Sequence, residues 1–372
     1  MAKTVQQLVD EVNARITAVK NKSSQKTLSL DEISDLLPYI VKPDNVARYE
    51  QGAVLIGDRS RFPFTKKTCQ CNSVEEVAKA IEGMITQGSG PWMAASYALV
   101  LAAREVEGKP ADKISRHMRQ AKQRLVATRP TNTALATRLD SVDIVIETAR
   151  TTGQPLEQKV LEWVQGMVAE VYSNYAKRAA VLADLIEDGD GILTNCFAET
   201  SFILGIAMAS AQGKDIHVYT PETRPYLQGA RLTAPSVQEL GIKVTLVTDN
   251  MPAHLMSLGK IQKYVTAADL ITLDGHVVNK VGTFQSAVAA QYHGIPYFPI
   301  AWGVDEKSRT KDDISIEVRN AEEIRKCMGQ ETTLDSIDAY YPAFDITPPE
   351  LVAGVISTQG VLSPYDLKGA SL

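Results

Sequence analysis

From residue 188 onward, short apolar runs alternate with stretches that have helical length and periodicity. This region opens with Asp188-Gly189-Asp190-Gly191, a cluster of turn-forming residues. Strands that alternate with helices usually form a parallel sheet, because each parallel crossover needs a connection of a dozen or more residues. The pattern therefore predicts a doubly wound, Rossmann-like α/β domain over residues 188–372. The expected strands are Gly191–Asn195, Asp215–Tyr219, Lys243–Val247, Lys263–Ala268 and Pro296–Ala301, with helices over Thr200–Ala211 and Gly282–His293.

Residues 1–187 differ, because their apolar residues recur at the three- and four-residue spacing of amphipathic helices. Ser73, with Glu76 three residues later, is typical of a capping box at the start of one such helix. An extended region at Ala53–Phe64 predicts a small sheet. We therefore expect a mainly helical N-terminal domain with a small β element over residues 1–187. Helices are expected near residues 5–19, 74–85, 92–104, 111–127, 132–149 and 156–187, with a short one near 349–358 in the C-terminal tail.

Length and charge limit the classes of protein that this chain can represent. The 372 residues allow two or three domains at about 150 residues each. The chain carries 39 Lys and Arg against 44 Asp and Glu, a net charge of -5, which disfavours a nucleic-acid partner. Four cysteines are too few for a disulfide scaffold, so we expect a cytoplasmic location. Polar residues interrupt the most apolar stretch, residues 191–211, so no membrane association is expected.

Polar residues follow the predicted strands at their carboxyl ends, where open parallel sheets bind ligands. Cys196 follows the first strand. It is either a buried thiol that packs like a small apolar residue, or a thiolate base or nucleophile made more acidic by the next helix's N-terminus. Asp249 and Asp269 follow later strands, and each is either a turn-forming residue or a general acid whose proton is retained by burial. Sequence position alone leaves these alternatives open.

Three further segments suit an anion, although each is also common without one. Gln87–Pro91 is a glycine-containing turn directly before a helix, so its backbone N–H groups are available to a ligand. Arg129 lies at a helix junction, where its guanidinium suits a phosphate. The pair Asn279-Lys280 is expected to open a helix. Zinc-knuckle spacing, a phosphate-binding loop and a dinucleotide fingerprint are missing from the sequence, so neither a metal nor a cofactor is expected.

The segment Glu222–Thr233, which reads ETRPYLQGARLT, strongly resembles a signature of the methylthioribose-1-phosphate isomerase family. That family is related to ribose-1,5-bisphosphate isomerases and to the regulatory subunits of the eukaryotic translation initiation exchange factor. Further segments are similar to family motifs and follow in order along the chain, so the resemblance covers about residues 53–361. They are Arg129–Thr131, Val247–Met251, Asn279–Thr283, and Pro342–Asp345 with Thr347-Pro348.

The resemblance implies an aldose–ketose isomerase that converts a ribose 1-phosphate derivative, such as 5-methylthioribose 1-phosphate, to the ribulose 1-phosphate, a reaction of methionine salvage. It implies that Cys196 and Asp269 are catalytic, a pair that the non-catalytic translation-factor subunits generally lack. A homodimer formed through the sheet domain is implied as well. The residues implied to bind the sugar phosphate are Gly88, Ser89, Arg129, Gln228, Asn279 and Lys280, without a metal or cofactor.

The expected chemistry uses Cys196 and Asp269 together. The anomeric oxygen of an aldose 1-phosphate is blocked, so the ring has to open by protonation of its ring oxygen, which a protonated Asp269 would supply. A thiolate at Cys196 would move the C2 proton to C1 through an enol, and a hydride shift in a dry pocket is the alternative route. Phosphate contacts would position the substrate for either route.

Several residues depart from the family pattern near the expected site. Gln87 stands where the family usually has an arginine, Asn195 precedes the cysteine in place of a histidine, and Leu270 follows the aspartate in place of an arginine. Ala301-Trp302-Gly303 replaces a small, polar run. These departures keep two alternatives open, a ribose-1,5-bisphosphate isomerase and a non-catalytic regulatory subunit that binds a sugar phosphate or nucleotide.

Overall fold

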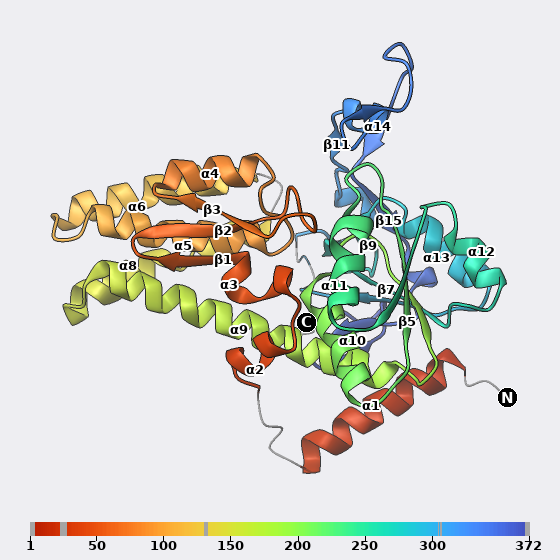
Figure 1. Ribbon diagram of the computed structural model, residues 1–372. Coiled ribbons are helices and arrows are strands. Elements are labelled where there is room, and N and C mark those ends of the chain that lie inside the picture. The colour runs from red at the N-terminus through yellow and green to blue at the C-terminus, as the bar shows by residue number, and fades with distance from the viewer. Residues whose placement is uncertain (1–3, 23–27, 130–132, 304, 306, 369–372) are drawn as a thin grey trace. The chain divides into compact units, whose positions relative to one another are not determined.

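The computed structural model describes residues 4–22, 28–129, 133–303, 305 and 307–368, and Figure 1 shows their helices and strands. The chain forms two compact units, one over Tyr39–Tyr172 and the other over Met1–Pro38 together with Ser173–Leu372. This division differs from the one predicted at residues 187 and 188. The N-terminal helix α1 (Val5–Lys22) belongs with the C-terminal unit because the Asn13 side chain bonds the backbone of Val361.

The larger unit contains a seven-stranded sheet in the order β17-β16-β10-β7-β4-β5-β6. Of these strands, β17 at the edge runs antiparallel to its neighbour, and the other six are parallel. Counted along the chain, the parallel strands lie in the order 6-5-4-1-2-3, the doubly wound Rossmann arrangement. The predicted fold class and all five predicted strands are therefore confirmed. The strands are β4 (Gly191–Leu193), β5 (His217–Pro221), β6 (Lys243–Val247), β7 (Lys263–Ala267), β10 (Tyr297–Ile300), β16 (Val355–Ser357) and β17 (Gly360–Leu362).

The core of this unit lies between the sheet and the helices that connect its strands. Tyr264 of β7 and Tyr297 of β10 stack with ring centroids 4.6 Å apart, and the Tyr297 hydroxyl hydrogen-bonds Thr266 Oγ1 at 2.8 Å. Gly205 lets its helix approach a neighbour closely, because a Cβ there would lie 2.7 Å from the Leu182 side chain. The connecting helices are α10 (Glu199–Ala211), α11 (Ala234–Glu239), α12 (Pro252–Ser257) and α13 (Thr283–Tyr292).

The helix predicted near residues 349–358 is wrong. A single 3-10 turn, η4 (Pro349–Leu351), precedes the hairpin of β16 and β17. Val355 and Ile356 are fully buried, and Ile356 pairs with Ile300 of β10. Two β-branched residues on a buried surface favour a strand, and pairing with the main sheet outweighs the local preference.

The chain also forms a second, three-stranded sheet in the order β15-β9-β8, which lies next to the carboxyl edge of the main sheet. Its strands are β8 (Leu270–Ile271), β9 (Val277–Lys280) and β15 (Phe344–Thr347). Figure 1 shows an arm that projects beyond this sheet and contains α14 and β11. The arm comprises β11 (Val318–Arg319), α14 (Glu322–Arg325), β12 (Lys326–Cys327) and β13 (Gln330–Glu331), and it returns through β14 (Tyr341–Pro342), which pairs with β11.

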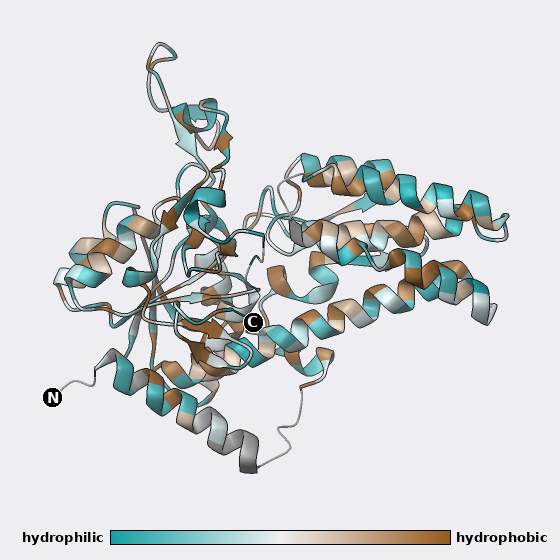
Figure 2. Ribbon diagram, turned by 180° about the vertical axis from the view of Figure 1, so that it is seen from behind, coloured by the Kyte–Doolittle hydropathy of each residue, from teal (hydrophilic) through white to brown (hydrophobic). Residues whose placement is uncertain are grey.

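The smaller unit combines an antiparallel sheet with helices, as predicted for a mainly helical region with a small β element. Its central helix α5 is buried from Gly90 to Ala103. The long helix α9 continues into the other unit, and Figure 2 shows apolar and polar segments alternating along it. The helix predicted over 132–149 is interrupted at Asp140-Ser141 and forms α7 and α8. The elements are α2 (Leu30–Asp35) of the larger unit, then η1 (Tyr39–Val41), α3 (Pro43–Val46), β1 (Ala47–Glu50), β2 (Ala53–Asp58), β3 (Lys67–Cys71), α4 (Val74–Glu82), α5 (Gly90–Glu105), α6 (Ala111–Val126), α7 (Thr133–Leu139), α8 (Val142–Thr152) and α9 (Leu156–Leu185).

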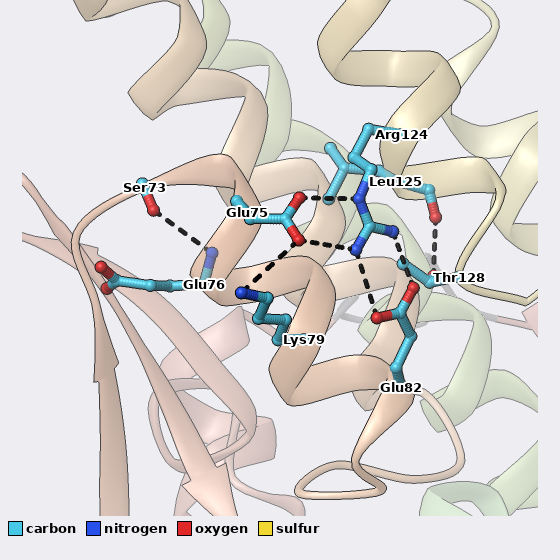
Figure 3. Close-up of polar contacts among 8 residues, drawn as sticks. All are labelled: Ser73, Glu75, Glu76, Lys79, Glu82, Arg124, Leu125 and Thr128. Carbon is cyan, nitrogen blue, oxygen red and sulfur yellow. Dashed lines mark hydrogen bonds and ion pairs between the residues drawn. The ribbon is translucent and has the colours of Figure 1, made fainter.

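Arg124 connects α6 to α4 through two glutamates, as Figure 3 shows. Its guanidinium donates to Glu75 at 2.7 and 3.0 Å and to Glu82 at 2.7 and 3.2 Å. Ser73 caps α4 by accepting the Glu76 N–H at 3.2 Å, as the sequence predicts. The Glu76 carboxylate reaches one residue further back than a standard capping box and accepts the Asn72 N–H at 2.7 Å.

None of the helices in the described part of the chain is both long and apolar enough to cross a membrane.

Candidate functional site

Cys196 and Asp269 lie on either side of the point where the strand order of the main sheet reverses. β4 and β7 are neighbours in this sheet, Cys196 follows β4, and Asp269 follows β7. Connections leave this point in opposite directions, so a crevice forms there, and doubly wound sheets bind their ligands in it. The structure brings together the two predicted catalytic residues, and their side chains interact electrostatically.

Two threonines of the segment Glu222–Thr233 hold the backbone of Cys196. Thr223 Oγ1 accepts the Cys196 N–H at 3.1 Å, and the Thr233 hydroxyl donates to the Cys196 carbonyl at 2.6 Å. The second hydroxyl also accepts the Ala198 N–H at 3.3 Å. The segment Glu222–Thr233 therefore positions the cysteine loop, and this is the structural role of its two threonines.

Four residues without the freedom of glycine adopt left-handed backbone conformations in the segments near Cys196 and at the start of α10. They have φ values between 60° and 68° and are Cys196, Glu199, Thr223 and Leu227. A β-branched residue such as Thr223 is rare in this region, and each such residue costs of the order of 1–3 kcal/mol. Such strain persists only where the surroundings fix the conformation, and it concentrates at functional sites.

Asp249 stabilises this strained segment. Its Oδ1 accepts the Thr223 N–H and its Oδ2 accepts the Arg224 N–H, both at 2.7 Å. Because both carboxylate oxygens bind backbone N–H groups, Asp249 acts as a turn-forming residue, and the alternative of a general acid is wrong. Arg224 itself points into the arm, where its guanidinium donates to the carbonyls of Ile324 and Lys326, each at 2.9 Å.

Asn279 and Lys280 end strand β9, so the prediction that they open a helix is wrong. The following helix α13 begins at Thr283, after Gly282 in a left-handed conformation with φ of 99°. Thr283 Oγ1 accepts from the side chains of Asn195 and Asn279, each at 3.0 Å, and donates to the Lys280 carbonyl at 2.7 Å. The threonine thus ties the cysteine loop to the end of β9 and keeps Lys280 beside Cys196.

Burial raises the pKa of the Cys196 thiol to about 11, while the Lys280 ammonium opposes this rise and Asp269 adds to it. The expectation of a more acidic thiol is wrong for the substrate-free chain. A thiolate loses its hydration when it is buried, and this loss outweighs the favourable effect of the Phe197 backbone N–H at the start of the next helical region. The thiol is therefore protonated at neutral pH in this state.

Asp269 shifts in the direction that an acid needs. Burial raises the pKa of its carboxyl, and the positive charges of Lys280 and Arg319 oppose that rise. Burial also lowers the pKa of the Lys280 ammonium, with Cys196 and Asp269 acting against the change. Desolvation disfavours the charged form of each of the three groups, and the opposite charge of a neighbouring group partly offsets this cost. Cys196, Asp269 and Lys280 therefore form one coupled polar cluster.

Four residues at this cluster escape prediction from the sequence. Arg319 binds Glu317 in a two-pronged ion pair, with N···O distances of 3.1 and 3.2 Å. The Lys280 Nζ lies 4.9 Å from the ring centroid of Phe344 and 5.8 Å from that of Tyr341. The signal in the sequence is weak, because Glu317 and Arg319 lie outside the family motifs and outside the predicted strands and helices.

Gln228 lies at the start of an irregular turn, η2 (Gly229–Thr233), whose π-helical geometry often marks functional positions. Its side chain is buried, and within the described residues its Oε1 has no hydrogen-bond partner. A buried carbonyl oxygen in this condition is available to a donor on a ligand. Glycine is required next to it, because a Cβ at Gly229 would lie 1.8 Å from the Pro221 carbonyl oxygen.

Gly88, Ser89 and Arg129 belong to the smaller unit. Gly88 has φ of 61°, and Ser89 directly precedes the 16-residue helix α5. The Ser89 hydroxyl is buried and has no hydrogen-bond partner in the described part of the chain. A left-handed glycine before the N-terminus of a long helix suits an anion, as the sequence predicts.

Two arginines hold the elements around this turn. The Arg129 Nη2 donates to the Ile81 carbonyl at 3.0 Å, while Pro130 and Thr131 of the same motif lie outside the described residues. The buried Arg59 donates to the carbonyl of Gln87 and, at 3.1 Å, to that of Ile40. A guanidinium from another strand-end loop thus contacts position 87, where the family pattern has an arginine.

A doubly wound sheet with a cysteine, an aspartate and a buried lysine at its strand reversal defines a Rossmann-like α/β protein with a polar site for a small ligand. The chain belongs to the Initiation factor 2 subunit family, whose sequence model matches residues 87–364.

Relatives of this chain include named isomerases. A methylthioribose-1-phosphate isomerase of Thermosipho africanus is 36% identical over 330 residues, covering 84% of this chain and 92% of the relative. Another from Desulfitobacterium hafniense is 37% identical over 329 residues, covering 83% and 93%. The crystal structure of 5-methylthioribose 1-phosphate isomerase from Pyrococcus horikoshii matches with a TM-score of 0.78 and 28% identity, covering 87% of this chain and 95% of that one. The translation initiation factor eIF-2B subunit delta from A. fulgidus matches with a TM-score of 0.73 and 33% identity, covering 86% and 96%.

Proposed function

We propose that this protein is an aldose–ketose isomerase that converts 5-methylthioribose 1-phosphate, or a close ribose 1-phosphate derivative, to the ribulose 1-phosphate. The observation that carries the proposal is the pairing of Cys196 with Asp269 across the strand reversal, with Lys280 beside both. The isomerases from Thermosipho africanus and Desulfitobacterium hafniense support the substrate class. The role in methionine salvage follows from that substrate.

Ring opening is assigned to Asp269. Desolvation raises the pKa of its carboxyl, so the proton that the ring oxygen needs is retained further toward neutral pH than in an aspartate surrounded by water. After the ring opens, the carboxylate left behind is stabilised by the positive charges of Lys280 and Arg319. The same two positive charges disfavour reprotonation of the Asp269 carboxylate. Turnover therefore requires a proton from solvent or from the substrate hydroxyl.

Hydrogen transfer from C2 to C1 takes place beside Cys196. A thiol with a pKa of about 11 is a poor base at neutral pH, which favours direct transfer of a hydride from C2 to C1. In that route Cys196 contributes a compact, apolar surface that excludes water from the reacting carbons. Proton abstraction through an enol would require the bound substrate to lower the pKa of the thiol.

The sugar phosphate is proposed to contact Gln228, Asn279 and Lys280 of the larger unit. The buried Gln228 carbonyl oxygen suits a sugar hydroxyl, and the Lys280 ammonium suits a negative charge. Within the smaller unit, the phosphate-binding role of Gly88, Ser89 and Arg129 is proposed on the strength of the motif resemblance alone. Arg129→Met is expected to raise the KM for the sugar phosphate more than it lowers kcat.

A direct assay tests this function. We expect turnover of at least one of 5-methylthioribose 1-phosphate, 5-deoxyribose 1-phosphate and ribose 1,5-bisphosphate, followed by NMR. Asp269→Asn should lower kcat by about a hundredfold or more, the range of lost acid–base catalysis, and Cys196→Ser should lower kcat because a hydroxyl replaces the apolar surface of the thiol. Lack of turnover of all three compounds would reject the substrate class, and full activity in either variant would reject its assigned role.

A non-catalytic binding subunit is the second candidate, and Gln87 in place of the family arginine favours it. The similarity to the subunit delta structure from A. fulgidus gives it further support. Under this alternative, nucleotides or sugar phosphates would raise the melting temperature without being converted. Retention of both Cys196 and Asp269 favours the enzyme.

A homodimer is proposed from an exposed apolar stripe on α13. Phe284, Val288 and Tyr292 recur at four-residue spacing and are 40%, 46% and 85% exposed. Met251 and Leu258, on either side of the neighbouring α12, extend this apolar surface. Light scattering should give the mass of two chains, and the Val288→Asp variant should give the mass of one.

A cytoplasmic location is also proposed, because all four cysteines are free.

A further inference from the structure

Glu317 and Arg319 enter the coupled cluster from the base of the arm, far along the chain from Cys196. Arg319 lies on strand β11 and Glu317 directly precedes this strand, while Val318 between them is 58% exposed. The Arg319 side chain is 19% exposed and forms the two-pronged ion pair with Glu317. An arginine in this arrangement has a fixed orientation, unlike a free surface arginine.

The segment Tyr341–Thr347 joins β11 to the strand that carries Lys280. β14 pairs Tyr341 with Arg319, and three residues later β15 pairs Phe344 with Lys280. Between these pairs, the Ala343 N–H donates to the Glu317 carbonyl at 2.8 Å and the Ala343 carbonyl accepts the Val281 N–H at 3.2 Å. One continuous piece of backbone therefore fixes Arg319 relative to Lys280.

The two cations share one aromatic ring. The Lys280 Nζ lies 4.9 Å and the Arg319 guanidinium carbon 5.8 Å from the centroid of Phe344. The negative face of an aromatic ring attracts a cation within about 6 Å, which lets two like charges lie near each other at lower cost. The ring thus keeps Arg319 and Lys280 in the same part of the site.

We propose that Arg319 is a positioning residue of this site: held by Glu317 and by the segment Tyr341–Thr347, it fixes Lys280 and supplies a second positive charge that stabilises the ionised forms of Cys196 and Asp269. This role deepens the proposed isomerase function. It explains the arm's attachment to the motif segment, because Arg224 bonds the arm at Ile324 and Lys326.

The groups that face the Cys196 thiol come from several elements, and each has a definite effect on its pKa. The Lys280 ammonium on β9, the Phe197 N–H and the Arg319 guanidinium on β11 lower it, whereas Asp269 raises it. Tyr341 on β14 interacts electrostatically with the same thiol. Removal of the Arg319 charge should therefore raise the pKa of Cys196 further, and a purely structural arginine would have no such effect.

The test measures the reactivity of Cys196 toward iodoacetamide between pH 7 and 11, without substrate, with mass spectrometry separating its peptide from those of the other three cysteines. Arg319→Met is expected to lower the Cys196 rate at pH 8.5 about tenfold, which corresponds to one pKa unit. Arg319→Lys should stay within about threefold of the unchanged protein. Arg150→Met is the matched control, because it removes one charge and one ion pair on the exposed face of α8.

A rate in Arg319→Met equal to that in Arg150→Met would overturn the proposal. Glu317→Gln covers the case in which Arg319→Met does not fold. It leaves Arg319 less neutralised, so Cys196 should react about two- to threefold faster, and an unchanged or slower rate would also overturn the proposal. The measurement needs no substrate, so it tests the role of Arg319 independently of the isomerase activity. A negative isomerase assay would not contradict this role, and an unchanged Cys196 rate would not contradict the isomerase activity.

Discussion

The side-chain hydroxyl of Thr223 accepts the backbone N–H of Cys196 at 3.1 Å, although 27 residues separate the two in the sequence. Thr223→Val keeps the β-branched shape and removes the acceptor. A buried N–H without a partner costs about 1–3 kcal/mol, and the cysteine loop loses its anchor. We expect a lower melting temperature and a kcat reduced about tenfold or more. Thr223→Ser retains the acceptor and should keep most of the activity; equal losses in both variants would argue against this hydrogen bond.

Asp345 should make the stability of the protein depend on pH. Burial raises the pKa of its carboxyl from 3.8 to about 6, although the N–H groups of Gly282 and Phe284 donate to it. Because the folded pKa lies above the unfolded one, the stabilisation is complete below about pH 4 and is lost as the pH rises through about 6. A shift of about two units corresponds to at most about 3 kcal/mol. Urea unfolding of Asp345→Asn should lack this pH-dependent loss.

The control for that measurement is Asp112→Asn, on the exposed face of α6. It should show the same change in the free energy of unfolding between pH 4 and pH 7 as the unchanged protein. The assignment fails if Asp345→Asn retains the full pH dependence.

The fate of the C2 hydrogen distinguishes the two possible routes of isomerisation. With the thiol pKa at about 11, we expect a hydride shift, so the product formed in deuterium oxide should carry little deuterium at C1. Proton NMR of the product gives this fraction directly. Complete deuterium incorporation at C1 would establish proton abstraction instead, with Cys196 ionised in the complex.

Arg59 should control the turn that contains Gly88 and Ser89. Its guanidinium donates to the carbonyls of Gln87 and Ile40, and a lysine cannot span both with one ammonium. Arg59→Lys is therefore expected to raise the KM for the sugar phosphate about tenfold, with a smaller change in kcat. Arg61→Lys, two residues away and exposed, is the matched control. Identical KM values for the two variants would exclude this role.

Asn13 protects the edge of the main sheet. Its Nδ2 donates to the Val361 carbonyl and its Oδ1 accepts the Val361 N–H, each at 2.9 Å, so a side chain replaces a neighbouring strand. Asn13→Leu leaves both backbone groups of this edge residue unpaired. We expect a loss of about 1–3 kcal/mol in the free energy of unfolding and more aggregation by light scattering. Gln6→Leu, exposed on the same helix, should show neither effect.

Much of the larger unit could be predicted because its local patterns agree with its tertiary environment. Four of the five predicted strands are largely buried and lie inside the sheet, and their apolar runs have the composition that such strands need, while β6 forms an edge of the sheet. The helix predicted near residues 349–358 was wrong because Val355 and Ile356 pair with β10, a contact that local periodicity does not report. The prediction that Lys280 opens a helix is wrong for a similar reason, since its strand β9 is defined by pairing with Phe344–Thr347.

The order of residues along the chain is enough to predict that Cys196 and Asp269 follow strands and therefore lie at the carboxyl edge of the sheet. The tertiary structure makes β4 and β7 neighbours, and local patterns cannot predict this because strand order depends on how the crossover helices pack. It also brought Arg319 to Lys280 through backbone hydrogen bonds and raised the pKa of Cys196. Burial and neighbouring charge decide protonation, and both arise from residues that are distant along the chain.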